Sequence, residues 1–64
     1  MPSIIVEAGM LNSEKKKRLI RELTETASEI SGVPQSSFTV LLKENPIENW
    51  GVGGTPLVEL MNHS

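Results

Sequence analysis

Hydrophobic and polar positions divide the chain into three blocks. The first, residues 3–8, is rich in β-branched residues and ends at Gly9, which is typical of a short strand. From about residue 13 to residue 31, apolar residues recur at a period near 3.6, which predicts one amphipathic helix. The apolar stripe of this helix consists of Leu19, Ile20, Leu23, Ala27 and Ile30.

Residues suited to helix ends flank the predicted helix. Asn12 or Ser13 is a suitable N-cap, and Glu14 places negative charge in the first turn. Gly32 is well placed just after the last turn, and Pro34 prevents the helix from continuing.

The third block, residues 37–44, predicts a second strand, in which apolar side chains again occur on both faces. Phe38, Val40 and Leu42 share one face, while Leu41 lies on the other. Residues 48–56 contain three glycines and predict a tight hairpin turn. The apolar tail 57–61 is too short to assign.

A strand, a helix and a strand in this order predict an α/β fold with one βαβ unit, a two-stranded parallel sheet and a C-terminal hairpin. We expect a single domain over residues 1–64. One helix covers only one face of such a sheet, yet both strands are apolar on both faces. We therefore expect other copies of the chain to cover the second face.

The composition narrows the possible functions. The 64 residues include no Cys, and the one His is His63, so disulfides, zinc sites and a Ser-His-Asp triad are not expected. Six basic and eight acidic residues give a net charge of -2, which does not favour nucleic-acid binding. No apolar run is long enough to span a membrane, and the first residues lack a signal-peptide pattern. We expect a cytoplasmic protein without a metal or cofactor.

Pro2 is the strongest candidate for chemistry. If Met1 is removed, Pro2 presents a secondary amine, which can act as a general base when apolar burial lowers its pKa. Other candidates are weaker. The basic run 15–18 and the glutamates at 22, 25 and 29 are typical of a solvated helix face, and the glycine-rich segment 51–54 does not match a phosphate-binding loop.

The whole pattern resembles the 4-oxalocrotonate tautomerase family. The resemblance rests on Pro2 before a strand, Leu19-Ile20-Arg21-Glu22 in the helix, Gly32-x-Pro34, the strand from Phe38 to Glu44, and Asn49-Trp50-Gly51-Val52-Gly53-Gly54. The segment from Glu44 to Asn49 is similar to a divergent subgroup whose members include proteins named DmpI. The resemblance implies a hexamer of βαβ chains that moves protons between keto and enol forms of 2-oxo acids, with Pro2 as the base.

The resemblance also implies a substrate-binding wall, with Trp50 at the family's aromatic position. Leu11 and Thr39 lie in the segments where characterised relatives carry two substrate-binding arginines. Lys43 and Arg18 are the nearest basic alternatives. A monocarboxylate, neutral ketone or aryl enol is therefore expected to suit this chain better than a dicarboxylate. The alternatives are a catalytically silent oligomeric module of the same fold, and Pro2 as a nucleophile that forms an iminium.

Overall fold

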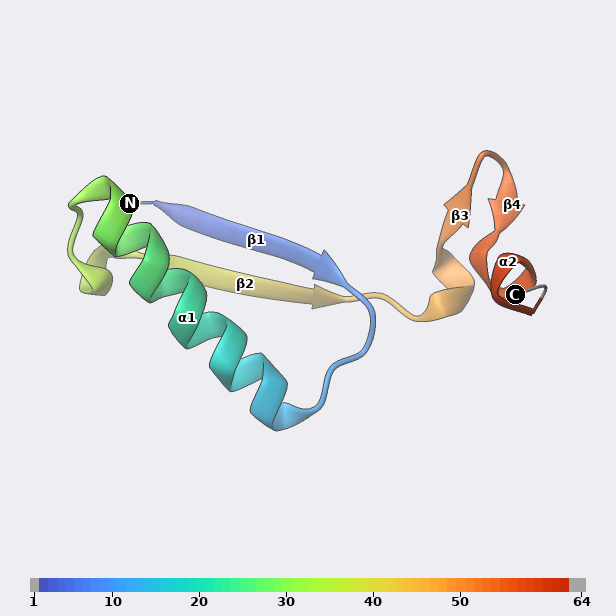
Figure 1. Cartoon of the computed structure of the whole chain (residues 1–64), viewed down its shortest axis with the longest axis horizontal. Helices are drawn as coiled ribbons and strands as arrows, with labels where there is room; N and C mark the ends of the chain where they lie inside the picture. Colours follow the sequence, from blue (N-terminus) through green and yellow to red (C-terminus); the bar gives the residue numbers. More distant parts are fainter. Residues whose placement is uncertain (1, 63–64) are drawn as a thin grey trace.

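A computed structural model, which describes residues 2–62, confirms the predicted βαβ unit (Figure 1). Strand β1 (Ser3–Ala8) and helix α1 (Ser13–Ser31) have the predicted bounds. Strand β2 (Thr39–Glu44) runs parallel to β1, with residues 3 and 8 opposite residues 39 and 44. The second strand begins two residues later than predicted, because Gln35–Ser37 form a 3-10 turn.

Capping interactions set the two ends of α1. The Asn12 side chain accepts a hydrogen bond from the Lys15 backbone N–H at 2.8 Å, so Asn12 rather than Ser13 is the N-cap. Gly32 adopts a left-handed conformation with φ 75°, and its N–H donates to the Ser28 carbonyl at 2.9 Å. A glycine suits this position because it has no Cβ to clash.

The C-terminal part forms the predicted hairpin and also a helix that the sequence did not assign. Strands β3 (Gly51–Val52) and β4 (Thr55–Pro56) are antiparallel, and the two glycines between them have φ values of 60° and 86°. Positive φ at both positions is typical of a two-residue hairpin turn. Helix α2 (Leu57–Asn62) follows directly.

The two faces of the main sheet differ in exposure. Alternate residues of β1 and β2, including Val6 and Val40, are half-buried. On the other face, Ile5 and Leu41 lie opposite each other and retain 58% and 49% of their accessible surface. The chain itself leaves this second face uncovered, as the apolar pattern predicted.

One residue of the predicted apolar stripe of α1 does not pack against the sheet. Leu19, Leu23 and Ala27 are half-buried, but Ile30 is 82% exposed. In the last turns, the Ser28 hydroxyl donates to the Val33 carbonyl at 2.6 Å, so the side of α1 that carries Ser28 faces the following segment. Ile20 is also exposed and lies at the margin of the stripe.

A single chain buries only a small part of its surface. Among residues 2–61 no side chain is fully buried, and the accessible surface is 5007 Å². A compact protein of 7.0 kDa would expose about 4,000 Å². The radius of gyration is 15.3 Å, against about 11 Å for a compact chain of this length. In Figure 1 the hairpin and α2 stand beyond the end of the sheet, which accounts for the extended shape.

The exposed apolar surface is spread over most elements. Nine large apolar side chains are exposed among the described residues: Ile5, Met10, Ile20, Ile30, Leu41, Ile47, Val52, Leu60 and Met61. Neither helix in the part of the chain that the structure describes is long and apolar enough to cross a membrane.

Candidate active site

The predicted site residues lie at two opposite ends of the sheet. Pro2 directly precedes β1 and is half-buried. Its carbonyl accepts a hydrogen bond from the Thr39 N–H at 3.1 Å, which extends the β1–β2 pairing by one residue. The Thr39 side chain is exposed beside it. Pro2 and Thr39 are therefore brought together, and the strand pairing holds the proline in position.

Leu11 lies at the other end of the sheet, where Glu44 ties three elements together. The Leu11 N–H donates to Glu44 Oε2 at 3.0 Å, and the Lys16 ammonium forms an ion pair with the same carboxylate. These contacts lower the pKa of Glu44 below its ordinary value of 4.5, and the contact with Lys16 has the largest effect. The carboxylate thus connects the end of β2 to the loop after β1 and to the first turn of α1.

Trp50 is anchored at this second end by polar contacts. Its indole Nε1 donates to the Asn45 carbonyl at 3.1 Å, and the Asn45 side chain donates to Glu7 Oε1 at 3.0 Å. An open hollow of about 300 Å³ is lined by Glu7, Asn45, Asn49 and Trp50. The indole is therefore held at the margin of a surface hollow, and it is half-buried rather than part of a core.

Pro2 and Trp50 do not meet within one chain. The six residues of β1 lie between their two ends of the sheet, which amounts to about 20 Å of strand. Figure 1 shows the same separation between the start of β1 and the hairpin. A contact in which Trp50 shields the Pro2 nitrogen requires Trp50 from another copy. The role of Trp50 as a wall of the pocket stays a prediction.

Basic side chains also lie away from Pro2. Five of the six are in residues 15–21, the first half of α1, and Lys43 lies near the C-terminal end of β2. Arg18 forms an ion pair with Glu22 of its own helix. Neither Arg18 nor Lys43 is therefore positioned by this chain to bind a carboxylate at its own Pro2.

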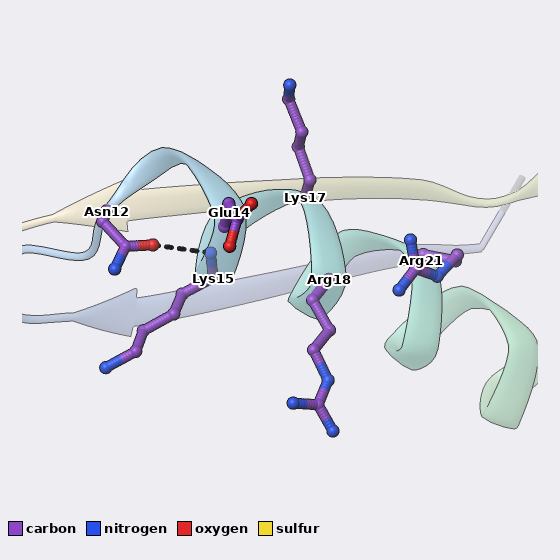
Figure 2. Close-up of a pocket in the computed structure, with 6 residues that line it drawn as sticks. All are labelled: Asn12, Glu14, Lys15, Lys17, Arg18 and Arg21. Atoms are coloured by element: carbon purple, nitrogen blue, oxygen red, sulfur yellow. Dashed lines mark hydrogen bonds between the residues drawn. The ribbon is translucent and has the colours of Figure 1, made fainter.

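The basic run itself borders an open hollow of about 480 Å³. Figure 2 shows that its side chains diverge: Lys15 and Arg18 point to one side of α1, and Lys17 points to the opposite side. Charges that diverge in this way do not converge on one ligand, and Lys16 is paired with Glu44. The interpretation of the other side chains as a solvated helix face stays a prediction.

The structure also reveals residues that sequence reasoning missed. The roles of Glu44 and Asn45 depend on contacts with segments more than thirty residues away in the chain. One signal was available for Glu44, because it continues the alternation of Val40 and Leu42 and so lies on the face toward α1. Among residues 2–62, no group of three side chains could hold a metal ion, and the expectation that no cofactor is used stays a prediction. His63 and Met1 lie outside the described residues.

Comparison with known proteins agrees with this architecture. The family model described as "Tautomerase enzyme" matches residues 2–60. A probable tautomerase from Ralstonia nicotianae is 42% identical over 43 residues, which are 67% of this chain and 61% of that protein. A 2-hydroxymuconate tautomerase from Pseudomonas putida is 35% identical over 46 residues, covering 72% and 73% of the two chains.

Solved structures give a fuller match. TomN, a 4-oxalocrotonate tautomerase homologue of the tomaymycin biosynthetic pathway, superposes with a TM-score of 0.90 at 31% identity over 95% of both chains. DmpI from Archaeoglobus fulgidus is 40% identical, with a TM-score of 0.82 over 89% of this chain and 98% of that one. A heterohexameric 4-oxalocrotonate tautomerase from Chloroflexus aurantiacus is 30% identical, with a TM-score of 0.83 over 94% and 98%.

Proposed function

The chain belongs to the tautomerase family, and we propose that it is a cofactor-free isomerase that interconverts keto and enol forms of a 2-oxo acid or a related enol. Pro2 is the proposed general base. The observation that carries this proposal is the position of Pro2, which directly precedes β1 and is held by the Thr39 N–H at 3.1 Å. The pairing uses only the Pro2 carbonyl, so it does not occupy the nitrogen.

Removal of Met1 turns the Pro2 nitrogen from an amide into a secondary amine. The neutral amine takes a proton from the enol hydroxyl as the carbonyl double bond forms, and the resulting ammonium returns a proton to carbon at the other end of the conjugated system. The proton count balances, and neither an oxidant nor a reductant takes part. At neutral pH the cycle requires a lowered amine pKa, which desolvation would provide.

A second copy of the chain would complete the site. An antiparallel, two-fold arrangement places the Trp50 end of one sheet beside the Pro2 end of another. The uncovered face at Ile5 and Leu41 supports assembly of this kind, and a hexamer is the proposed final state. In this arrangement Trp50 supplies the apolar wall, while Lys43 of a neighbouring copy becomes the first candidate to bind a substrate carboxylate.

The substrate is proposed to be a monocarboxylate or an aryl enol. Leu11 and Thr39 carry no charge where characterised relatives use arginines, so two charge-assisted contacts are missing. The loss of one such contact, worth about 1.5–3 kcal/mol, reduces efficiency by about one to two powers of ten. A matched panel of dicarboxylates and monocarboxylates measures this difference. A dicarboxylate as the best substrate would contradict the argument and direct attention to Lys43.

Two alternative functions predict results different from those of general base catalysis by Pro2. A silent oligomeric module is favoured by the two missing arginines, in the segments where this chain carries Leu11 and Thr39, and it predicts no turnover of any enol. A nucleophilic Pro2 that forms an iminium predicts a covalent adduct with a carbonyl compound after borohydride reduction. General base catalysis leaves no adduct.

The test compares three forms of the protein: the trimmed chain, a chain with one residue added before Pro2, and Pro2→Ala. Intact mass shows whether Met1 is absent. We expect the trimmed protein to turn over enols, the extended protein to lose activity because its nitrogen is an amide, and Pro2→Ala to be weakened but folded. kcat/KM should rise with pH through one ionisation, and Trp50→Ala should shift that ionisation upward. Equal activity in the extended and trimmed forms would refute the role of Pro2 as the general base.

A further inference from the structure

Two hydroxyl side chains lie directly beside Pro2. Ser3 and Thr39 are partners at the start of the parallel pairing of β1 and β2, and both are exposed. Figure 1 shows the starts of the two strands side by side. The hydrogen bond from the Thr39 N–H to the Pro2 carbonyl, at 3.1 Å, fixes this register. We call Ser3 and Thr39 the hydroxyl pair.

The hydroxyl pair lies at one end of the sheet face that α1 does not cover. Side chains alternate across a strand, so the pair shares this face with Ile5 and Leu41, which are partners two residues farther along. Lys43 is the one basic residue of β1 and β2, and it lies four positions beyond Thr39, a distance of about 13 Å along the strand. Next to the proline, the two strands therefore offer hydroxyls and no charge on this face.

Neither member of the hydroxyl pair has a partner in the part of the chain that the structure describes. Other hydroxyls do have one: those of Thr24 and Ser28 donate to backbone carbonyls at 2.7 Å and 2.6 Å. A hydroxyl both donates and accepts hydrogen bonds. The pair is therefore available to a ligand oxygen of either kind.

The spacing of the hydroxyl pair suits a single ligand oxygen. Neighbouring strands are about 4.8 Å apart. Two donors that each lie about 2.8 Å from one oxygen atom can be up to about 5.6 Å from each other. Both hydroxyls can thus donate to one oxygen between them. That oxygen lies close to the Pro2 nitrogen, because consecutive Cα atoms are only about 3.8 Å apart.

We propose that the hydroxyl pair binds the reacting oxygen of the substrate, which is a hydroxyl in the enol and a carbonyl in the ketone. The proposal rests on the proposed role of Pro2 as the base. The enol oxygen gives its proton to the Pro2 nitrogen while it accepts hydrogen bonds from Ser3 and Thr39. Negative charge develops on the oxygen as the proton leaves, so these bonds strengthen in the transition state.

This role narrows the substrate class. A guanidinium is a charged donor and suits a carboxylate, whereas the hydroxyl pair is neutral and suits a neutral oxygen. The hydroxyl pair therefore favours a ketone or an aryl enol whose reacting oxygen sits beside Pro2. We expect the pair to contribute equally to substrates with and without a carboxylate, since it does not bind that group.

Removal of each hydroxyl provides the test. Thr39→Val keeps the shape and the β-branched side chain, and Ser3→Ala removes only the hydroxyl, so both variants should fold and assemble. Each should lower kcat by about tenfold with a smaller change in KM, because the lost bond is strongest in the transition state. Thr39→Ser and Ser3→Thr keep a hydroxyl and should retain most of the rate. Ser36→Ala and Thr26→Val make the same changes at other exposed hydroxyls and should leave kcat unchanged.

Two ketones of matched shape separate the reacting oxygen from a carboxylate. Phenylacetone carries a methyl group where phenylpyruvate carries its carboxylate, and NMR follows deuterium uptake at the methylene carbon of both. Ser3→Ala/Thr39→Val should slow the two exchanges by the same factor. A loss confined to phenylpyruvate would show that the pair binds the carboxylate, and it would overturn the proposal. An unchanged kcat in the double variant would overturn it as well.

Mixed oligomers test whether the pair acts on Pro2 of its own chain. One component is the double variant, which has a free proline, and the other is the chain extended by one residue, which has both hydroxyls but a blocked nitrogen. No chain in the mixture carries both functions, so activity should stay at the level of the double variant. A rise toward the wild-type rate would show that the hydroxyls serve a neighbouring copy, which contradicts the proposal as stated.

Binding of an inert enol separates this proposal from the role of Pro2 as a base. Phenol is an enol that its aromatic ring keeps from ketonising, and toluene has the same size without the oxygen. In NMR titrations, the ratio of phenol affinity to toluene affinity should fall by about tenfold in the double variant, because a neutral hydrogen bond is lost. An unchanged ratio would refute binding by the hydroxyl pair, whereas an inactive wild type with this fall would refute only the base.

Discussion

Replacement of Leu41 by glutamate tests the central claim about assembly. Leu41 lies on the face of the sheet that α1 does not cover, opposite Ile5, and keeps 49% of its accessible surface. If the chain folds alone, the new carboxylate remains in water. A surface substitution of this kind changes the free energy of unfolding by about 0.5 kcal/mol or less.

The expected effect is much larger if another copy covers this face. Burial of the remaining half of a leucine contributes about 1 kcal/mol per chain, which the variant loses. A buried glutamate must also be neutralised. Protonation at pH 7 of a carboxyl with an ordinary pKa near 4.3 costs about 4 kcal/mol. The total, about 5 kcal/mol per chain, is comparable with the whole stability of a small domain.

Light scattering and thermal unfolding at two protein concentrations provide the assay. The wild type should show an oligomeric mass and a Tm that rises with concentration, whereas Leu41→Glu should lose both together. Ile30→Glu is the control, because it makes the same kind of change at a side chain that is 82% exposed on α1. Wild-type mass and Tm in Leu41→Glu would refute the claim that this face is buried.

Three further predictions concern local contacts. The Glu44 pKa is lowered by its contacts, so their stabilisation is present above about pH 4.5 and is lost as the pH falls through the lowered value. Glu44→Gln should therefore have a lower Tm than the wild type at pH 7, and the difference should narrow near pH 3. Gly54→Ala should cost about 1 kcal/mol in thermal unfolding because φ is 86°, whereas Gly53→Asn should be nearly neutral. Trp50→Phe should cost about 1 kcal/mol by loss of its 3.1 Å hydrogen bond to a backbone carbonyl, and an unchanged Tm would show that this bond is not stabilising.

Local features of the sequence were sufficient to predict the main helix and strands. The bounds of β1 and α1 were predicted because a β-branched run, a helical period, an N-cap and a left-handed glycine all act within a few residues. The uncovered sheet face was predictable for a related reason. Side chains alternate strictly across a strand, so the apolar residues of both faces can be counted without knowledge of the tertiary structure.

Only the tertiary structure could show the features that depend on contacts between distant segments of the chain. The sequence could not show that Ile30 faces solvent, because helical period places it on the stripe and only the packing of the last turn excludes it. The hydrogen bond from the Leu11 N–H to the Glu44 carboxylate joins residues 33 positions apart, and no local preference encodes such a pair. Likewise, Pro2 and Trp50 belong to one sequence pattern but lie at opposite ends of the sheet, because parallel strands carry the chain from one end to the other between them. Residue order specifies each element, whereas the separation of two functional side chains follows from strand direction and register.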